Sequence, residues 1–317
     1  MSVTVSLSSA EGMRLDPVVR TLLRAAHAAR PLRSGSLLLT LFGDSIAPRG
    51  GEVGLGPLIA LAHPLGLSER HVRTSIGRLA RENWLESTRI GRLSYYRLTE
   101  RGQLDFALAT TRIYGRAASA WSGAWTMLLL GELDAAERER LSADFRWRGF
   151  GRPMPGVLVY PGERLEETRG ELARHHCGAR VAALRGATGS LDADLELARR
   201  AWDLGELETQ YARFVRRFAP VERALERAPG TPVACFVVRT LLIHGYRRIH
   251  LRDPLLPSAL LPGSWTGSAA ADLCGRLYGR VFAGAERFVS AHARNRAGPL
   301  PPAAPEALRR FGGVRSR

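Results

Sequence analysis

Hydrophobic residues in the first third of the chain recur every three or four positions, which is the spacing of a helix with one buried face. The spacing predicts helices over 17–30, 37–46, 55–66 and 68–83. Two short extended runs follow, and the Gly91–Arg92 dipeptide between them is typical of a hairpin turn. The predicted order is therefore three helices and a two-stranded hairpin, preceded by an N-terminal extension that contains a helix of its own.

The middle of the chain alternates between short apolar runs and amphipathic segments. The apolar runs, bounded by glycine and proline, predict strands over 124–130, 155–162 and 179–186. The segments between them predict helices over 134–150 and 163–175. A strand–helix–strand–helix–strand order over about 60 residues favours a small α+β unit of ferredoxin-like type.

Beyond residue 191 the hydrophobic spacing is helical again. A long amphipathic helix is predicted over 204–225, and Pro229 and Pro232 follow its end. Two more helices are predicted over 233–249 and 266–293. The proline- and glycine-rich end of the chain predicts a flexible tail. The fold class that follows from these elements is α+β and mostly α.

The charge of the chain indicates the kind of partner that it binds. The 317-residue chain has 46 basic residues, all of them arginine, against 30 acidic residues, and its formal net charge is +16. A GC-rich genome explains the choice of arginine over lysine but not the excess over the acids. Such an excess favours acidic partners, namely nucleic acid, phosphorylated ligands or an anionic membrane. The guanidinium group adds planar, two-point recognition of phosphate.

Several classes of protein are disfavoured by the residues present. The three cysteines, Cys177, Cys235 and Cys274, are far apart and lack CxxC spacing, so neither a disulfide framework nor a zinc site is predicted. The N-terminus has no signal-peptide pattern, and no run of about 18 apolar residues predicts a membrane span. The adjacent residues His175, His176 and Cys177 have side chains that rarely converge on one metal ion. We therefore expect a cytoplasmic protein without a metal or another cofactor.

The predicted helix at 68–83 contains four arginines. On a helical wheel, one apolar stripe is formed by Val72, Ile76, Leu79 and Ala80. The largely opposite face is formed by Arg70, Arg73, Thr74, Gly77 and Arg81. A cationic helix that follows a shorter helix and a glycine-containing turn has the helix–turn–helix arrangement, whose second helix enters the major groove of DNA. The hairpin directly after it would make the arrangement a winged helix–turn–helix.

The candidate DNA contacts follow from this arrangement. We expect them to be Ser68, Arg70, His71, Arg73, Thr74 and Arg78 on the helix, and Arg89, Arg92 and Tyr95 on the hairpin. A solvated charged face is the alternative for the helix alone, and a purely structural role is the alternative for the hairpin alone. Their adjacency favours DNA binding. Gly77 costs the helix about 1 kcal/mol relative to alanine, and it either permits close approach of the backbone or has no function.

Two sets of short motifs occur far apart in the chain. The first set is Gly43–Asp44, Arg49–Gly50–Gly51, Leu65–Gly66–Leu67–Ser68, Val72–Arg73, Arg78–Leu79, Trp84–Leu85, Gly91–Arg92 and Tyr95–Tyr96. The second set is HGYRRIHLRDPLLPSALLPGSWTG at 244–267 and LCGRLY at 273–278. In this order, over residues 35 to about 285, they resemble the PaaX family, repressors of phenylacetic-acid catabolic operons. The chain departs from the family pattern at Gly245, where an acid is expected, and at Asn83, where glycine is expected.

The second motif set contains a cluster of basic and aromatic residues. We expect an effector to contact His244, Tyr246, Arg247, Arg248, Asp253 and Trp265. Arginines suit the phosphates of a coenzyme A thioester, and aromatic and aliphatic walls suit an acyl group. The resemblance implies that an aryl-acyl-CoA, phenylacetyl-CoA or a related compound, releases the repressor from DNA. A domain-packing or dimer motif is the alternative interpretation of the same cluster.

The combined hypothesis is a homodimeric repressor of an aromatic-acid (phenylacetate-type) catabolic operon, with double-stranded operator DNA and an acyl-CoA as partners. The expected domains are an N-terminal extension or helix at 1–34, a winged helix–turn–helix DNA-binding domain at 35–102, a linker helix at 103–123, a ferredoxin-like α+β domain at 124–190, a helical C-terminal effector and dimerisation domain at 191–296, and a flexible tail at 297–317.

Two alternatives belong to other classes of protein. One is a metal-dependent nuclease or a CoA-ester hydrolase that carries a nucleic-acid-binding domain, with Glu132 or Asp134 as the candidate acid. No second acidic cluster or base accompanies them in the sequence, so we do not expect an enzyme. The other is an RNA-binding or architectural protein, which would show neither sequence preference nor a response to an effector.

Overall fold

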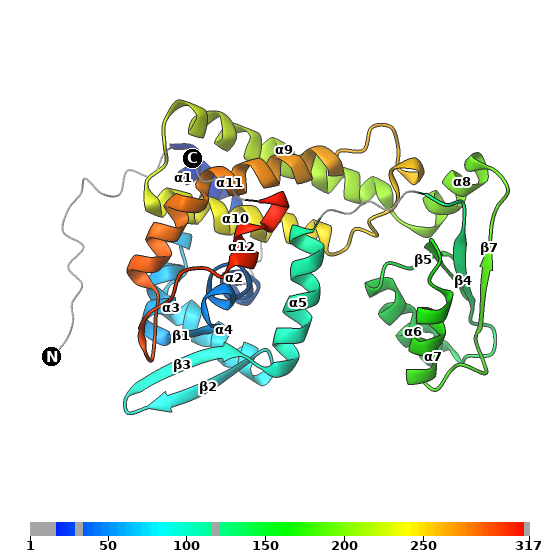
Figure 1. The fold of residues 1–317 in the computed structure, drawn as a ribbon, viewed down its shortest axis with the longest axis horizontal. Helices are drawn as coiled ribbons and strands as arrows, with labels where there is room; N and C mark the ends of the chain where they lie inside the picture. Colours follow the sequence, from blue (N-terminus) through cyan, green and yellow to red (C-terminus); the bar gives the residue numbers. More distant parts are fainter. Residues whose placement is uncertain (1–16, 29–33, 116–120, 314–317) are drawn as a thin grey trace. The chain divides into compact units, whose positions relative to one another are not determined.

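A computed structural model of the chain describes residues 17–28, 34–115 and 121–313 (Figure 1). The described residues form two compact units. Unit 1 comprises the described parts of Met1–Tyr114, Phe214–Tyr246 and Ala271–Arg317, and unit 2 comprises those of Gly115–Arg213 and Arg247–Ala270. The expected helical domain at 191–296 is therefore divided between the two units. Within the expected N-terminal extension, residues 1–16 and 29–33 lie outside the described residues.

The N-terminal part of unit 1 follows the order that the hydrophobic spacing predicts. Within the described residues, four helices precede the hairpin: α1 (Pro17–Ala28), α2 (Ser34–Leu41), α3 (Leu55–Ala62) and α4 (Glu69–Arg81). Helix α2 continues into a π-helical turn at Phe42–Ile46 and a 3-10 turn at Ala47–Arg49. Gly50 and Gly51 then take φ values of +85° and +75°. Glycine adopts this left-handed conformation without steric cost, so the pair ends the helical run.

A three-stranded antiparallel sheet completes this part of the chain. Its strands are β1 (Glu52–Gly54), β2 (Leu85–Ile90) and β3 (Leu93–Leu98), in the order β1-β3-β2. Ile90 pairs with Leu93, so Gly91 and Arg92 alone form the turn between β2 and β3. Gly91 has a φ of +59°, and glycine at the first of two turn positions suits a type II′ turn, whose twist matches that of the strands. The predicted hairpin is confirmed.

Helices longer than those before the hairpin also belong to the fold. The expected linker helix at 103–123 corresponds to α5 (Glu100–Tyr114), and residues 116–120 lie outside the described residues. The long helices α9 (Leu204–Arg227), α10 (Pro232–His250) and α11 (Gly267–His292) each contribute to both units. In unit 1 the buried side chains of α10 and α11 include Phe236, Val237, Leu242, Leu277, Val281 and Val289. Gly284 lets the two helices approach closely, because a Cβ there would lie 2.6 Å from Cys235 Sγ.

The end of the chain corrects one prediction. Instead of a flexible tail at 297–317, the structure contains β9 (Gly298–Pro299), paired with β8 (Arg294–Asn295), and α12 (Pro305–Leu308). Ala304 N donates to Pro48 O at 2.8 Å, and Arg310 is buried. The tail prediction is wrong for 297–313 because the Arg310 guanidinium pairs with a buried carboxylate and anchors the segment. Residues 314–317 lie outside the described residues.

Unit 2 contains a four-stranded sheet in the order β5-β6-β4-β7, and each neighbouring pair is antiparallel. Three of its strands match the predicted ones: β4 (Trp125–Leu129), β6 (Val157–Pro161) and β7 (Ala182–Gly186). The fourth, β5 (Gly151–Met154), adds to the predicted order. Its sequence, GRPM, has no apolar run, and its proline is tolerated because β5 is an edge strand. A Cβ at Gly151 would lie 2.5 Å from the Trp202 ring, so this strand packs closely against the segment at Ala201 and Trp202.

The core of unit 2 lies between the sheet and two helices, α6 (Ala135–Trp147) and α7 (Leu165–Arg174). Its buried members include Leu128, Leu130, Leu141, Phe145, Leu158 and Leu172. Trp125 precedes Leu128 by three residues on β4, so its side chain lies on the opposite face of the sheet. There Trp125 Nε1 donates to the buried Asp194 of α8 (Leu191–Ala201) at 2.6 Å. Helix α8 therefore covers the second face.

Candidate nucleic-acid interface

Helix α4 begins with a side-chain cap. Ser68 Oγ accepts a hydrogen bond from His71 N at 3.3 Å, and Glu69 lies in the first turn. Arg78 and Arg81 lie in the last turn. A carboxylate near the positive N-terminal end and cations near the negative C-terminal end each stabilise a helix by about 0.3–1 kcal/mol. The predicted helix over 68–83 is confirmed, and Ser68 has a structural role at its start.

The buried face of α4 differs from the prediction at two positions, Ser75 and Ala80. Its buried residues are Val72, Ser75, Ile76 and Leu79, whereas Ala80 is exposed. Ser75 Oγ lies 2.5 Å from Ser34 Oγ at the start of α2. The wheel places Ala80 on the stripe because it follows Ile76 by four residues. The contact with α2 instead falls on the side of Ser75, whose hydroxyl is satisfied by the partner serine.

The other face of α4 is exposed and cationic, and we call it the cationic face. Its residues are Arg70, His71, Arg73, Thr74, Gly77, Arg78 and Arg81. Arg73 Nη2 pairs with Glu69 Oε1 at 2.7 Å, but the two side chains are 56% and 58% exposed. An exposed pair of this kind is worth at most about 1 kcal/mol. Arg73 can therefore exchange Glu69 for a phosphate group at little cost.

Arg78 is oriented differently from the other arginines of α4. Its guanidinium covers Gly35 of α2, since a Cβ at Gly35 would lie 2.3 Å from Arg78 Nη2. Its Nε lies 3.7 Å from Glu82 Oε1, and the side chain is 46% exposed. Among the predicted helix contacts, Arg78 is thus one whose guanidinium contacts α2 while its side chain stays partly exposed.

The β2–β3 hairpin is drawn in cyan in Figure 1. Its sequence has arginines on both sides of Gly91. Arg89 Nε donates to Gly91 O at 3.2 Å, and Arg92 is exposed. Ile90 and Leu93 beside them are 48% and 62% exposed. We call Arg89, Ile90, Gly91, Arg92 and Leu93 the hairpin tip. It presents two guanidinium groups together with apolar side chains.

Tyr95, the third expected contact on the hairpin, lies farther from the tip and is half-buried. It is paired with Gly54 of β1 on one side and with Thr88 of β2 on the other. The expected contacts on the hairpin therefore divide into two exposed arginines and one tyrosine within the sheet.

The cationic face and the hairpin tip belong to the same unit and are consecutive in the chain. An α-helix with its side chains is about 10–12 Å across, and the major groove of B-DNA is about 12 Å wide. Guanidinium groups bind phosphate oxygens and guanine edges in a two-point geometry. This arrangement can contact a duplex at two places, through a helix and through a hairpin.

Gly77 provides a test of whether the backbone of α4 contacts DNA. No atom lies within 4 Å of the position that a Cβ would take at Gly77. We expect Gly77→Ala to raise the free energy of unfolding by roughly 0.5–1 kcal/mol, because alanine is the better helix former. If the backbone at Gly77 contacts DNA closely, the more stable variant will bind operator DNA more weakly. Denaturant unfolding and a gel-shift titration measure the two effects.

A matched control for Gly77 is Gly170, which lies inside α7 of unit 2 and is also exposed with open space around it. Gly170→Ala should give a similar stabilisation and leave DNA affinity unchanged. An unchanged DNA affinity in Gly77→Ala as well would contradict close approach of the backbone and leave Gly77 without a function.

A buried ion network in unit 1 was not expected from the sequence. We call it the Asp44 network, and it comprises Asp44, Arg49, Tyr114, Arg239, Tyr278, Glu286 and Arg310. Asp44 Oδ2 lies 3.0 Å from Arg239 Nε, and Asp44 Oδ1 lies 2.9 Å from Arg310 Nη1. The members come from the turn after α2, from α5, α10 and α11, and from the segment after α12. The network therefore joins the helix that packs on α4 to the C-terminal helices.

The ionisation of the network follows from burial and pairing. Burial would raise the pKa of the Asp44 carboxyl, but Arg239 and Arg310, with hydrogen bonds from Tyr114 and Tyr278, outweigh it and hold the pKa below its ordinary value. Tyr114 Oη donates to Asp44 Oδ1 at 2.8 Å, and Tyr278 Oη does so at 3.1 Å. Burial and the neighbouring Asp44 charge raise the pKa of Tyr278 to about 12. At neutral pH the carboxylate is therefore charged and the phenol is not.

The residues expected to bind an effector are divided between the two units. His244 and Tyr246 belong to unit 1, and the other four belong to unit 2: Arg247, Arg248, Asp253 and Trp265. His244 Nδ1 lies 3.0 Å from Thr40 Oγ1 of α2. Tyr246 is buried, with its ring centroid 5.7 Å from that of Phe214 on α9. These two contacts favour the domain-packing interpretation for His244 and Tyr246.

In unit 2, Asp253 organises the segment that follows α10. Its carboxylate accepts hydrogen bonds from Tyr211 Oη at 2.7 Å and from Leu255 N at 2.8 Å. Trp265 packs edge-on against Tyr211, with 5.6 Å between ring centroids. Arg247 is half-buried and Arg248 is exposed. Effector binding by these residues stays a prediction.

No helix in the described part of the chain is long and apolar enough to cross a membrane. Within 17–28, 34–115 and 121–313, no three His, Cys, Asp or Glu side chains are placed to hold a metal ion. His175, considered above as a metal ligand, pairs through Nε2 with Asp144 Oδ2 at 2.9 Å. Asp134, considered as a nuclease acid, caps α6 by accepting a hydrogen bond from Glu137 N at 2.8 Å.

Models of three protein families match consecutive parts of the chain. They are described as PaaX-like protein, which matches 33–102, PaaX protein central Cas2-like domain, which matches 118–198, and PaaX-like protein C-terminal domain, which matches 202–291. The chain is also similar to the solved structure of an uncharacterized protein from Mycobacterium tuberculosis, with a TM-score of 0.47 and 25% sequence identity. That match covers 72% of this chain and 89% of the other.

A curated relative extends the similarity over nearly the full length. It is the transcriptional repressor PaaX of Escherichia coli (strain K12), which is 36% identical over 302 residues, and the match covers 93% of this chain and 95% of the relative. The three family matches occur in the order in which the sequence motifs occur. On these grounds the chain belongs to the PaaX family.

Proposed function

We propose that the protein is a transcriptional repressor that binds operator DNA through the cationic face of α4 and the hairpin tip. The observation that carries the proposal is the exposure of Arg70, Arg73 and Arg81 on one face of a helix whose opposite face is buried. The name of the curated relative, a transcriptional repressor, supports the same function. The protein would act as a regulator and not as an enzyme.

We assign a winged helix–turn–helix to 35–102 and a ferredoxin-like fold to the sheet of unit 2. The first assignment is supported by α3, the turn at Gly66 and α4, followed by the β2–β3 hairpin as the wing. The second is supported by the element order β4-α6-β5-β6-α7-β7 in a sheet whose neighbouring strands are antiparallel.

The proposed repressor is a homodimer that an aryl-acyl-CoA releases from a phenylacetate-type operon. Two copies of α4 would enter successive major grooves, which are about 34 Å apart on one side of the duplex. Effector binding would favour a dimer geometry in which the two helices no longer match this spacing. To weaken operator binding about 100-fold, the effector must prefer that geometry by about 2.7 kcal/mol, which is within the usual range of allosteric coupling.

The experiment that tests this function is a gel-shift titration of the full-length protein on DNA from upstream of its own gene. We expect a complex that survives excess random DNA and dissociates on addition of phenylacetyl-CoA but not of phenylacetate. Equal binding to random DNA would contradict the repressor and favour an architectural protein. Specific binding to DNA that phenylacetyl-CoA does not reverse would contradict the proposed effector but not the proposed repressor.

A further inference from the structure

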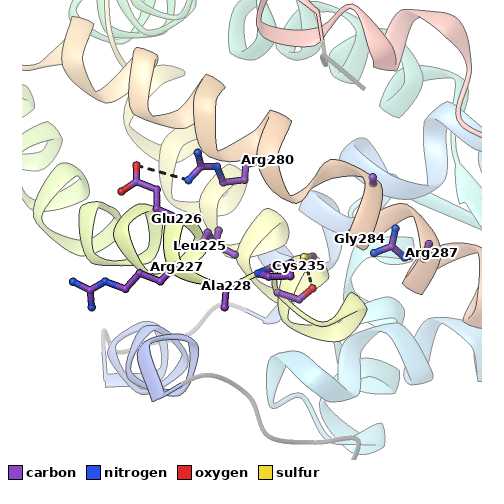
Figure 2. A pocket seen from close by; sticks show the side chains of 11 residues that line it. Leu225, Glu226, Arg227, Ala228, Cys235, Arg280, Gly284 and Arg287 are labelled. Atoms are coloured by element: carbon purple, nitrogen blue, oxygen red, sulfur yellow. Dashed lines mark hydrogen bonds and ion pairs between the residues drawn. The ribbon is translucent and has the colours of Figure 1, made fainter. Parts of the chain in front are cut away.

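A cavity of about 420 Å³ opens in unit 1 where the C-terminal end of α9 meets α10 and α11 (Figure 2). Three arginines line it, Arg227, Arg280 and Arg287, together with one acid, Glu226. Leu225 and Pro229 contribute apolar surface. The volume lies within the range of about 300–1,000 Å³ that is typical of small-molecule sites. None of these residues belongs to the cationic face or to the effector cluster expected from the sequence.

Charge pairing between α9 and α11 weakens toward the cavity. One turn away, Arg276 Nε and Nη2 donate to the carboxylate of Glu222 at 2.8 and 3.4 Å. At the cavity, Arg280 Nη1 is 3.7 Å from Glu226 Oε1, and both side chains are about half exposed. Farther along α11, Arg287 has no ion-pair partner among the residues that the structure describes. Of the arginines that line the cavity, Arg280 and Arg287 therefore have one loosely held counter-charge between them, that of Glu226.

Arg287 lies beside Gly284 and Cys235, neither of which is an ion-pair partner. Its Nη2 is 3.8 Å from the position that a Cβ would take at Gly284, and Cys235 Sγ lies against the same glycine. Figure 2 shows Arg287 beside Gly284 and Cys235, whereas Arg227 extends away from Cys235. Burial raises the pKa of the Cys235 thiol, and the charge of Arg287 offsets part of this rise. The thiol is thus neutral and supplies no counter-charge to Arg287.

The first turn of α10 borders the same cavity, since Cys235 belongs to that turn. Thr231 Oγ1 accepts a hydrogen bond from Ala234 N at 3.3 Å and caps this 19-residue helix. The N-terminal end of a helix carries a partial positive charge that favours anions. It adds to Arg280 and Arg287, so positive charge approaches the cavity from two elements.

We propose that this cavity binds a small organic phosphate, with phosphate oxygens between Arg280 and Arg287 and an apolar part against Leu225 and Pro229. Guanidinium groups bind phosphate through paired, charge-assisted hydrogen bonds. Inorganic phosphate would leave the apolar wall uncovered. The inference rests on the proposed function only if the ligand is an acyl-CoA. In that case the cavity, and not the cluster at 244–265, holds the phosphate-bearing part of the effector.

The test uses isothermal titration calorimetry on the full-length protein with phenylacetyl-CoA, coenzyme A, ADP and inorganic pyrophosphate. We expect at least one of the three organic phosphates to bind the parent protein more tightly than pyrophosphate does. The Arg280→Ala/Arg287→Ala variant should weaken that binding about 10- to 100-fold, because it removes charge-assisted hydrogen bonds. The matched control is Arg276→Ala, on the same helix but outside the cavity, and it should change the affinity by less than about threefold.

Amide hydrogen exchange locates the ligand independently of these variants. We expect protection at 225–235 and 280–287 when the tightest-binding organic phosphate is present. The proposal is wrong if none of the organic phosphates binds, if the double variant binds like the parent, if pyrophosphate binds as tightly as the organic phosphates, or if protection is confined to 244–265. A parent protein that fails to bind operator DNA would contradict the proposed function and leave these measurements valid, since they use no DNA.

Discussion

Replacing Asp44 with asparagine is expected to lower the free energy of unfolding by about 3–5 kcal/mol, because removal of one partner leaves buried charges uncompensated. The network holds three guanidinium groups, from Arg49, Arg239 and Arg310, and two carboxylates, from Asp44 and Glu286. Without the Asp44 charge, one carboxylate would remain for three cations. Urea unfolding of the full-length variant, followed by circular dichroism, measures the change.

The control for this variant is Asp105→Asn on α5. The Asp105 carboxylate is 45% exposed and lies 3.9 Å from Arg101, so its removal should change stability by no more than about 0.5 kcal/mol. A decrease of less than about 1 kcal/mol in Asp44→Asn would contradict the importance of the buried pairs.

The loss of stability caused by Asp44→Asn should become smaller at acidic pH. The pKa of Asp44 in the folded protein lies below its ordinary value. A lowered folded pKa gives a contribution that is fully present above the unfolded pKa, about 3.9, and is lost as the pH falls through the folded pKa. The difference between parent and variant should therefore be constant near neutral pH and shrink below about pH 4. A difference that grows on acidification would contradict an ionised Asp44.

The second large effect is expected from Arg73→Ala/Arg92→Ala, which removes one guanidinium from the cationic face and one from the hairpin tip. We expect operator affinity to fall by about 2–4 kcal/mol, which is roughly 30- to 1,000-fold. The slope of log affinity against log salt concentration should also become shallower, by about one unit for each DNA phosphate that the variant no longer binds. Gel-shift titrations at several salt concentrations give both quantities.

A matched control removes two arginines from unit 2, Arg169→Ala/Arg199→Ala. Their side chains are 55% and 75% exposed, and each pairs with a nearby glutamate. This variant has the same change in net charge, so it should reveal any effect of overall charge alone. Operator binding by Arg73→Ala/Arg92→Ala that equals the parent's would show that α4 and the hairpin are not the DNA-contacting elements.

Sequence periodicity is sufficient to predict an element that has a continuous apolar face. It predicts the long helix α9 and the recognition candidate α4 within a few residues, because Leu, Val and Phe recur at the helical spacing over several turns. The hairpin turn is predictable because Gly91 has a positive φ that other residues adopt at a cost. Strand β5 has no such pattern, since its residues lie at an edge of the sheet and carry little apolar surface.

The candidate site is predictable in residue type but not in side-chain direction. The spacing of arginines correctly places Arg70 and Arg73 on an exposed face. It cannot show that Arg78 covers Gly35, because that contact depends on how α2 packs against α4. The Asp44 network cannot be predicted from the sequence for a similar reason. Its members lie as far apart in sequence as Asp44 and Arg310, and buried ion pairs leave no periodic pattern.

The burial of Arg310 has a genetic consequence. A premature stop codon ahead of this residue would delete the cation beside Asp44 while every codon of α4 and the hairpin remained intact. If the proposed function holds, a selection for derepressed mutants should therefore recover nonsense and frameshift alleles at the far 3′ end of the gene, in addition to missense alleles in the cationic face and the hairpin tip.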